Sequence, residues 1–405
     1  MATIFRLIAF PPGTLSSLAH IYGIIFNGIK QAIHLLISGA HDLLLFGVSI
    51  GSYWVFIRMK ARDRNLQMQP LIKKIMLAVD YHHALPHEMK KRASNIACMS
   101  GCVASIFLLF LLPAASAAID TPMTLAVSSG QRKDDLNWSI AGNGVNVLSE
   151  LKWENLAINQ LVAVAEFHLR NDRRLRAKLG YGVISSGANQ DSDYQGNNRT
   201  QEYSRSNNKA GGDVLDASIG MGKKFRLRDL SAGKSFYVMP IAGLSLHRQN
   251  LTMTDGVQTL CALPDCTIPL GPFPGLASSY DAQWMGPWLG AEARVETEQG
   301  WSVMANAEYH LVEYSAKANW NLRADFSHPV SFRHTASGEG FVLSLGASYP
   351  VGNNWTMNFS MDKQNWTTRS GSDQTYLANG TLGYTRLNAV HWDSTAYNFG
   401  IVRKF

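Results

Sequence analysis

The sequence predicts an all-β protein, a ten-stranded antiparallel transmembrane β-barrel preceded by a signal peptide. Three observations support this prediction. Apolar and polar residues alternate through residues 118–405, an export signal comes immediately before them, and the chain stops on an alternating segment that ends at Phe405. Residues 118–405 contain no continuous apolar run long enough for a membrane-spanning helix, so any spanning elements must be strands.

The alternation has the polarity expected of strands that face lipid. One face of the segment near residue 345 carries Phe341, Leu343, Leu345, Ala347 and Tyr349, and the other is rich in Gly and Ser. Aromatic residues lie near strand ends and charges lie deep within strands, which is typical of apolar-out, polar-in barrel strands with aromatic girdles. Only a closed sheet pairs every backbone group in lipid, so a barrel is favoured over a soluble sandwich.

Turn signals divide this region into ten strands. Short turns are expected at 170–173, 228–233, 297–299 and 351–353, and long loops at 188–210, 254–277, 317–330 and 370–389. Such alternation of short periplasmic turns with long external loops is a barrel property. The expected strands are 121–140, 146–169, 174–187, 211–227, 234–253, 278–296, 300–316, 331–350, 354–369 and 390–405.

A signal peptide is predicted at 89–117. Lys90, Lys91 and Arg92 form a basic start, an apolar segment runs from Val103 to Leu112, and Ala115-Ser116-Ala117 is a cleavage site. The apolar segment is too short for a span of about 20 residues. We therefore expect a barrel domain at 118–405 in the outer membrane of a Gram-negative cell.

Residues 1–88 do not fit an exported protein. They contain an apolar stretch, Leu35 to Ile57, that is long enough to cross a membrane and is followed by basic residues. Either the true start is Met89 and residues 1–88 are a mis-assigned upstream extension, or they form a membrane anchor.

The net charge of +7 belongs to the first part of the chain. Residues 1–117 hold 11 Lys and Arg and 4 Asp and Glu, whereas residues 118–405 hold 26 of each. No basic, aromatic-interleaved patch indicates nucleic-acid binding. The expected partners are outer-membrane lipid, including lipopolysaccharide, and the barrel-assembly machinery through Phe405, with the chain a monomer.

Two cysteines remain after the signal peptide. Cys261 and Cys266 are five positions apart, and in an oxidising periplasm we expect a disulfide between them. A metal pair is the alternative, but residues 118–405 offer no further thiol. No metal or other cofactor is expected.

An aspartate pair is the first candidate for chemistry. Asp191 and Asp193 are two positions apart, so on an extended segment both carboxylates point the same way. Such a pair can share a proton or orient a water molecule, although an Asx-rich loop is the simpler interpretation.

Several stretches resemble the omptins, ten-stranded outer-membrane aspartic proteases. The segments that resemble omptin strands are Leu148–Trp153, Gly187–Tyr194, Ser279–Gly290 and Tyr397–Phe405. With Arg199-Thr200 and Asn319–Arg323, they look closer to an omptin-related group, the Protochlamydia-type outer membrane proteins. The resemblance covers most of residues 121–405 and implies that Asp191 and Asp193 correspond to one half of the omptin catalytic site.

The second half of that site is not present at the expected place. Omptins place an Asp-x-His on the opposite wall, where this chain has Asn319, Trp320 and Asn321. His310 and His328 are weak substitutes for the base. We expect the aspartate pair to lie at the extracellular mouth, turned inward, in a polar site with Arg199 or a neighbouring strand.

Three functions remain open from the sequence. The first is a non-proteolytic barrel that binds a surface ligand or has a structural role. The second is an omptin-type endopeptidase with a rearranged catalytic dyad. The third is a narrow small-solute pore, which is disfavoured because side chains largely fill so narrow a barrel.

Overall fold

The computed structural model describes residues 43–50, 53–60 and 122–405, with gaps at 231–232, 263, 265 and 267. The first two ranges are β1 (Leu43–Ile50) and β2 (Tyr53–Lys60), an antiparallel hairpin in a compact unit separate from the barrel. This hairpin overlaps the apolar stretch Leu35–Ile57. The predicted signal peptide, 89–117, lies outside the described residues.

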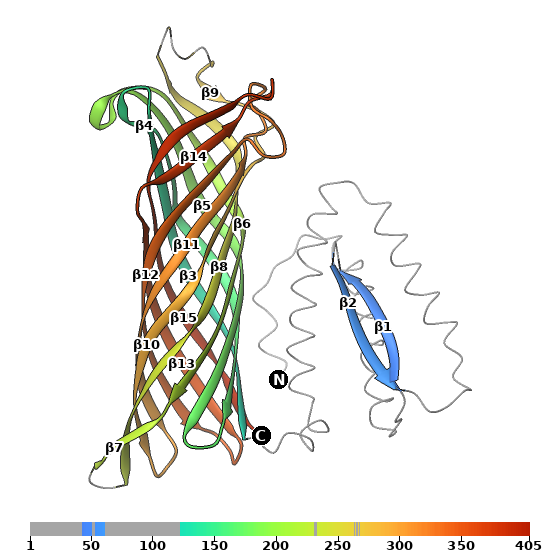
Figure 1. Cartoon of the computed structure of the whole chain (residues 1–405), viewed down its shortest axis with the longest axis vertical. Coiled ribbons are helices and arrows are strands. Elements are labelled where there is room, and N and C mark those ends of the chain that lie inside the picture. Colours follow the sequence, from blue (N-terminus) through green and yellow to red (C-terminus); the bar gives the residue numbers. More distant parts are fainter. Residues whose placement is uncertain are drawn as a thin grey trace. The chain divides into compact units, whose positions relative to one another are not determined.

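Ten long strands close into a ring, which confirms the predicted fold class (Figure 1). Each strand pairs antiparallel with the next, and the last, β15, pairs with the first, β3. Their bounds are β3 (Met123–Gly142), β4 (Val145–His168), β5 (Arg173–Gly196), β6 (Thr200–Lys223), β8 (Lys234–Cys261), β10 (Ser278–Thr297), β11 (Ser302–Asn319), β12 (Phe332–Pro350), β13 (Trp355–Thr368) and β15 (Leu382–Lys404).

Shorter elements extend the ring at its two ends. β7 (Phe225–Leu230) pairs with β8 at one end, whereas β9 (Gly271–Pro272) pairs with β8 at the other. β14 (Gly371–Tyr376) lies between β12 and β15, and the 3-10 turn η3 (Asn197–Arg199) joins β5 to β6. Among the described residues, no helix is long and apolar enough to cross a membrane.

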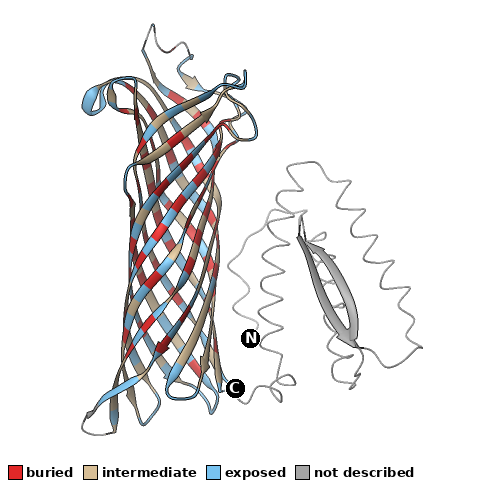
Figure 2. Cartoon of the chain, viewed as in Figure 1, coloured by how far each residue is buried: buried red, intermediate tan, exposed pale blue. Residues whose placement is uncertain are grey.

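The two faces of the strands differ as the alternation predicts (Figure 2). Large apolar side chains are exposed on the outer face, including Leu179, Ile219, Leu289 and Phe399. The opposite face is buried. The longest connections, 262–277, 320–331 and 369–381, lie at the end opposite to Phe405, so the Phe405 end is periplasmic and the other extracellular.

Side chains fill the interior in two zones. Within the membrane-spanning part the interior is charged: Arg132 bonds Asp134 at 2.5 Å and Asp216 at 2.6 Å. Nearer the extracellular end aromatic rings fill the interior; for example, Trp366 stacks on Trp392 with ring centroids 5.2 Å apart. The barrel is therefore cross-linked internally.

Two predicted loops are wrong. Residues 188–210 are the extracellular ends of β5 and β6 with η3 between them, and 370–389 include β14 and the start of β15. Both segments lie beyond the lipid-facing band, where the outer face of a strand meets water and becomes polar as well. Without an apolar outer face, the alternation that identifies a membrane strand disappears.

Candidate functional site

The aspartate pair lies inside the extracellular part of β5. Asp191 is the register partner of Leu151, a core residue only 1% exposed, and Asp193 is the partner of Ser149. Side chains of directly opposed residues lie on the same face of a sheet, so both carboxylates face the interior of the mouth. Ser149 also hydrogen-bonds Asp193.

Trp320 meets this pair from another wall of the barrel. Inward-facing residues of β11, such as Tyr314 and Ala318, are buried, and Trp320 continues their row just past the strand end. Its ring packs on Phe332 with centroids 4.6 Å apart, and its indole N–H donates a hydrogen bond to Asp191. Strands β6, β8 and β10 separate β5 from β11 in the shorter direction around the ring, so this bond spans the mouth.

The surroundings favour the protonated form of the carboxyl groups. Burial, followed by the charge of Asp193, raises the pKa of Asp191 to about 8, against the opposing effects of Trp320 and Arg323. Burial also raises the pKa of Asp193, which Ser149 and Arg323 oppose. The pair therefore retains a proton near neutral pH, which gives the site one hydrogen-bond donor and leaves the other carboxyl group as an acceptor.

Arg323 is the cation whose charge lowers the pKa values of both aspartates. The attraction of both aspartates contributes to raising the pKa of Arg323, but the largest contribution is its bond to Asp325, at 2.7 Å. The guanidinium also lies 4.3 Å from the centroid of the Phe326 ring. These contacts hold Arg323 on the segment that follows β11.

Of the two predicted partners of the aspartate pair, the neighbouring strand β4 contacts it, through Ser149, and Arg199 does not. Arg199 bonds the two carboxylate oxygens of Glu150 at 2.6 and 3.0 Å. The cause is the turn η3, where Asn197 and Asn198 hydrogen-bond Asn146 at the start of β4. This places Arg199 against β4, on the face opposite to the aspartates, because Glu150 alternates with Ser149 and Leu151.

The two asparagines beside Trp320 hold loops together. The side chain of Asn321 donates to the carbonyl oxygen of Gly275 at 2.7 Å and accepts from the N–H of Ala277 at 2.9 Å. Asn319 bonds Nδ1 of His328 at 2.7 Å. His328 is exposed, and among the described residues no hydrogen bond or ion pair joins it to Asp191 or Asp193.

His310 lies in a different part of the barrel. It is buried within the membrane-spanning part, where its ring nitrogens contact Ser245 at 3.0 Å and Glu308 at 3.1 Å. Trp320, which contacts the aspartate pair, lies ten positions further along β11 and the segment after it, a distance of roughly 30 Å in an extended strand. The structure therefore does not bring His310 and the aspartate pair together.

A histidine–aspartate pair that sequence reasoning missed lies elsewhere at the extracellular end. Nε2 of His334 is 3.3 Å from Asp373, and Nδ1 of His334 is 2.8 Å from the hydroxyl of Tyr280. His334 is fully buried, and its ring contacts Trp138 with centroids 4.7 Å apart. Water cannot reach this pair, so its role is to tie β10, β12 and β14 together.

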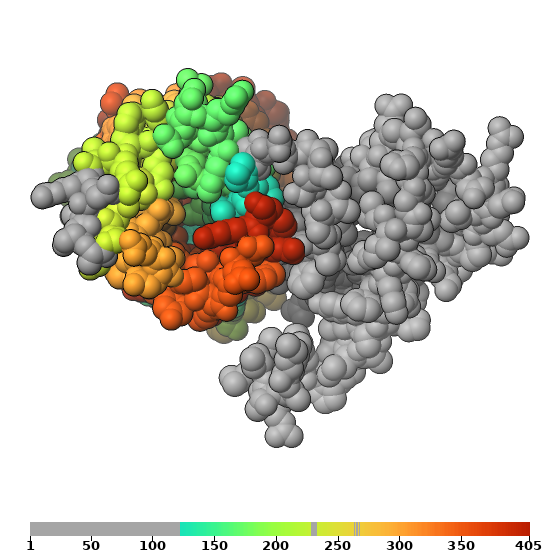
Figure 3. All heavy atoms as spheres, turned by 90° about the horizontal axis from the view of Figure 1, so that it is seen from below, coloured from blue at the N-terminus to red at the C-terminus, as the bar shows by residue number. Residues whose placement is uncertain are grey.

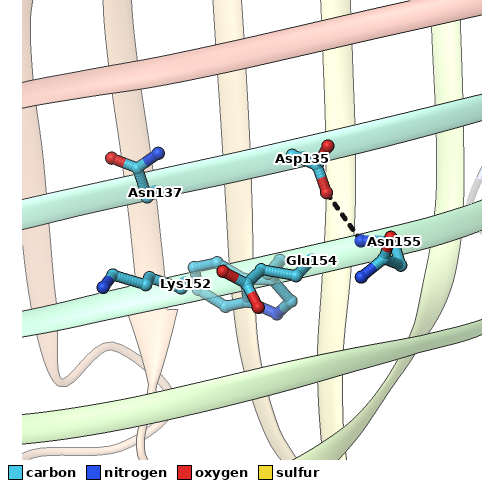
Figure 4. A pocket seen from close by; sticks show the side chains of 6 residues that line it. Asp135, Asn137, Lys152, Glu154 and Asn155 are labelled. Atoms are coloured by element: carbon cyan, nitrogen blue, oxygen red, sulfur yellow. Dashed lines mark hydrogen bonds between the residues drawn. The ribbon is translucent and has the colours of Figure 1, made fainter.

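Other features of the described chain add no catalytic group. A recess on the outer wall is lined by residues including Asp135, Asn137, Lys152 and Glu154, and the Asn155 N–H donates to Asp135 at 2.6 Å (Figure 4). The described residues contain no cluster of three or more His, Cys, Asp or Glu that could hold a metal. Cys261, the last residue of β8, forms a disulfide with Cys266 at the extracellular end.

Comparison with known proteins agrees with this architecture. The family model for Protochlamydia outer membrane proteins matches residues 126–405. The outer membrane protease OmpT from Escherichia coli is 15% identical, covering 71% of this chain and 98% of its own, with a TM-score of 0.58. The autotransporter translocator domain of NalP from Neisseria meningitidis is 13% identical over 76% of this chain and 98% of its own, with a TM-score of only 0.29. No curated protein sequence matches significantly.

Proposed function

Because this chain belongs to the Protochlamydia outer membrane protein family and forms an outer-membrane barrel, we propose that it binds a ligand at the cell surface without cleaving it. The observation that carries the proposal is the hydrogen bond from Trp320 to Asp191. An indole occupies the position opposite the carboxylates, where a protease of this architecture needs a group that accepts a proton from water.

The surroundings of the pair support the same conclusion. With the pKa of Asp191 raised to about 8, the two carboxyl groups hold one proton near neutral pH, and any base activity of the second group needs a partner across the mouth. Neither His310 nor His328 contacts the pair, and the buried His334 is bonded to Tyr280. Half of a catalytic constellation does not hydrolyse a peptide bond.

The pair is suited to binding. Asp191 and Asp193 are enclosed by the walls of the mouth but keep part of their surface accessible, and together they offer carboxyl oxygens as acceptors and one retained proton as a donor. The indole of Trp320 and the guanidinium of Arg323 border the same space. A peptide, with alternating N–H donors and carbonyl acceptors, matches such a set of groups.

The pore alternative is less well supported. Arg132 joins two carboxylates inside the barrel, and Trp366 and Trp392 stack above them. A solute would have to displace these buried, mutually bonded groups.

A retention experiment tests the binding proposal. The refolded barrel is immobilised, exposed to a random peptide library and washed, and the bound peptides are identified by mass spectrometry. We expect intact peptides that Asp191→Ala retains poorly, and a Lys133→Ala variant, altered on the outer face, should retain them normally. Equal retention by wild type and Asp191→Ala would show that the aspartate pair at the mouth is not the binding site.

A further inference from the structure

A cavity of about 530 Å³ opens at the periplasmic end of the barrel, opposite to the aspartate pair. The view along the barrel from this end shows the hollow between the strand ends (Figure 3). Its polar lining consists mainly of charged side chains, among them Glu166, Arg174, Lys224, Glu292, Arg294 and Lys404. Tyr237 and Met239 add an apolar wall.

Bonded side chains and apolar packing close the inner end of this cavity. Arg176 bridges Glu166 at 2.9 Å and Glu292 at 2.5 Å, across the interior. Met239 packs with Ile241 and Trp288 in a small buried apolar cluster. The cavity is therefore a blind site facing the periplasm and is not the entrance to a channel.

The carboxylates of the cavity already have cationic partners. Glu292 is held by Arg176 and also by Arg294, at 2.7 Å. Glu296 is held by Lys224 at 3.2 Å. The remaining carboxylate side chain, Glu166, is bonded by Arg176, and Phe405, the last residue, also lines the cavity.

Two cations lack a full partner among the carboxylate side chains. Arg174 approaches only Glu166, at 3.7 Å, and that carboxylate is already bonded by Arg176. Lys404 also lines the cavity and has no carboxylate partner among the residues that the structure describes. The cavity thus offers two cationic side chains without a full partner, next to an apolar wall.

We propose that this cavity binds a peptide carboxylate, with Arg174 and Lys404 as its contacts and the stem peptide of the cell wall as its source. A guanidinium recognises a carboxylate through two parallel hydrogen bonds, and an ammonium supplies a second charge. The volume accommodates a short peptide segment. The periplasmic position favours the cell wall, because its stem peptides carry several free carboxylates and lie beneath the outer membrane.

The test measures binding by isothermal titration calorimetry with the whole barrel in detergent. The probe is the tetrapeptide L-Ala-D-Glu-diaminopimelate-D-Ala. A version with amidated carboxylates tests the chemistry, and a linear peptide with one free C-terminal carboxylate tests the source. Arg174→Gln combined with Lys404→Gln removes both contacts, whereas Arg170→Gln changes an exposed arginine of the neighbouring turn that does not line the cavity.

We expect the double variant to bind the tetrapeptide at least about ten-fold more weakly, because it removes both charged contacts to the carboxylate. Arg170→Gln and the mouth variant Asp191→Asn should bind normally, so the result is independent of the proposed surface function. No wild-type binding, or unchanged binding by a double variant that keeps the heat-modifiable mobility of a folded barrel, would overturn the proposal. Equal affinity for the linear peptide would overturn the cell-wall source.

Discussion

The indole N–H of Trp320 donates a hydrogen bond to the carboxyl group of Asp191 across the extracellular mouth of the barrel. This bond joins the segment after β11 to β5 and brings an aromatic ring to the carboxylate pair. Asp191 accepts this hydrogen bond from an indole, and an indole cannot take up a proton from water.

The stability of the barrel should decrease as the pH rises through the titration of Asp191. Its pKa in the folded barrel is raised to about 8, above the value of about 4 expected in an unfolded chain. Folding therefore takes up a proton between pH 4 and pH 8. The contribution of the protonated Asp191 to stability is complete below pH 4 and is lost as the pH approaches 8. In urea unfolding, the free energy of unfolding should fall less between pH 5 and pH 9 for Asp191→Asn than for wild type. An identical loss in both proteins would contradict the raised pKa.

Much of the fold follows from the sequence because lipid imposes a strict pattern on strands. Each membrane segment must present apolar residues outward, as Leu343 and Leu345 do, so the ten strands are visible as alternation. The extracellular ends of β5 and β6 were missed because water surrounds both of their faces. The sequence there contains Gln190, Asp191, Asn207 and Asn208, which resemble a loop.

Only part of the mouth site could be predicted. The aspartate pair was identified because its two members are adjacent in sequence. Its contact with Trp320 depends on closure of the ring, and 129 positions separate Asp191 from Trp320. One signal was available: the inward row of β11, including Tyr314 and Ala318, continues in steps of two to Trp320. Arg199 was wrongly assigned because the fold of η3 has no sequence pattern that fixes its direction.

Removing the buried cation of Arg132 should destabilise the membrane-spanning part of the barrel. Arg132 is buried and bonds Asp134 and Asp216, so Arg132→Ala leaves the buried carboxylate of Asp134 without its cation and Asp216 with only His247. Breaking such a buried pair costs about 3–5 kcal/mol. The temperature at which the barrel loses its heat-modifiable gel mobility should fall markedly. Lys133→Ala, on the outer face of the same strand, is the control and should leave that temperature unchanged.

Cys261 and Cys266 should be oxidised in the protein isolated from membranes. The ring they close is small, so its contribution to stability should be on the order of 2 kcal/mol at most. Peptide mapping without reduction should yield the segment containing both cysteines lighter by two hydrogen atoms than after reduction. Alkylation of either thiol before reduction would contradict the disulfide.

The outer-membrane form should begin at Ala118. The prediction rests on the basic residues after Met89 and on the cleavage site Ala115-Ser116-Ala117. Intact-mass analysis of protein from purified outer membranes tests it directly. Recovery of a barrel that still carries residues 1–88 would instead support a membrane anchor.

The most direct test of the central claim is a time course of peptide hydrolysis by the refolded barrel. A broad peptide library is incubated with wild type and with Asp191→Ala and analysed by mass spectrometry, with OmpT from Escherichia coli as the positive control. We expect OmpT to produce cleavage products, whereas wild type and Asp191→Ala should both leave the library intact. Cleavage by wild type at ordinary enzymatic rates that Asp191→Ala abolishes would contradict it.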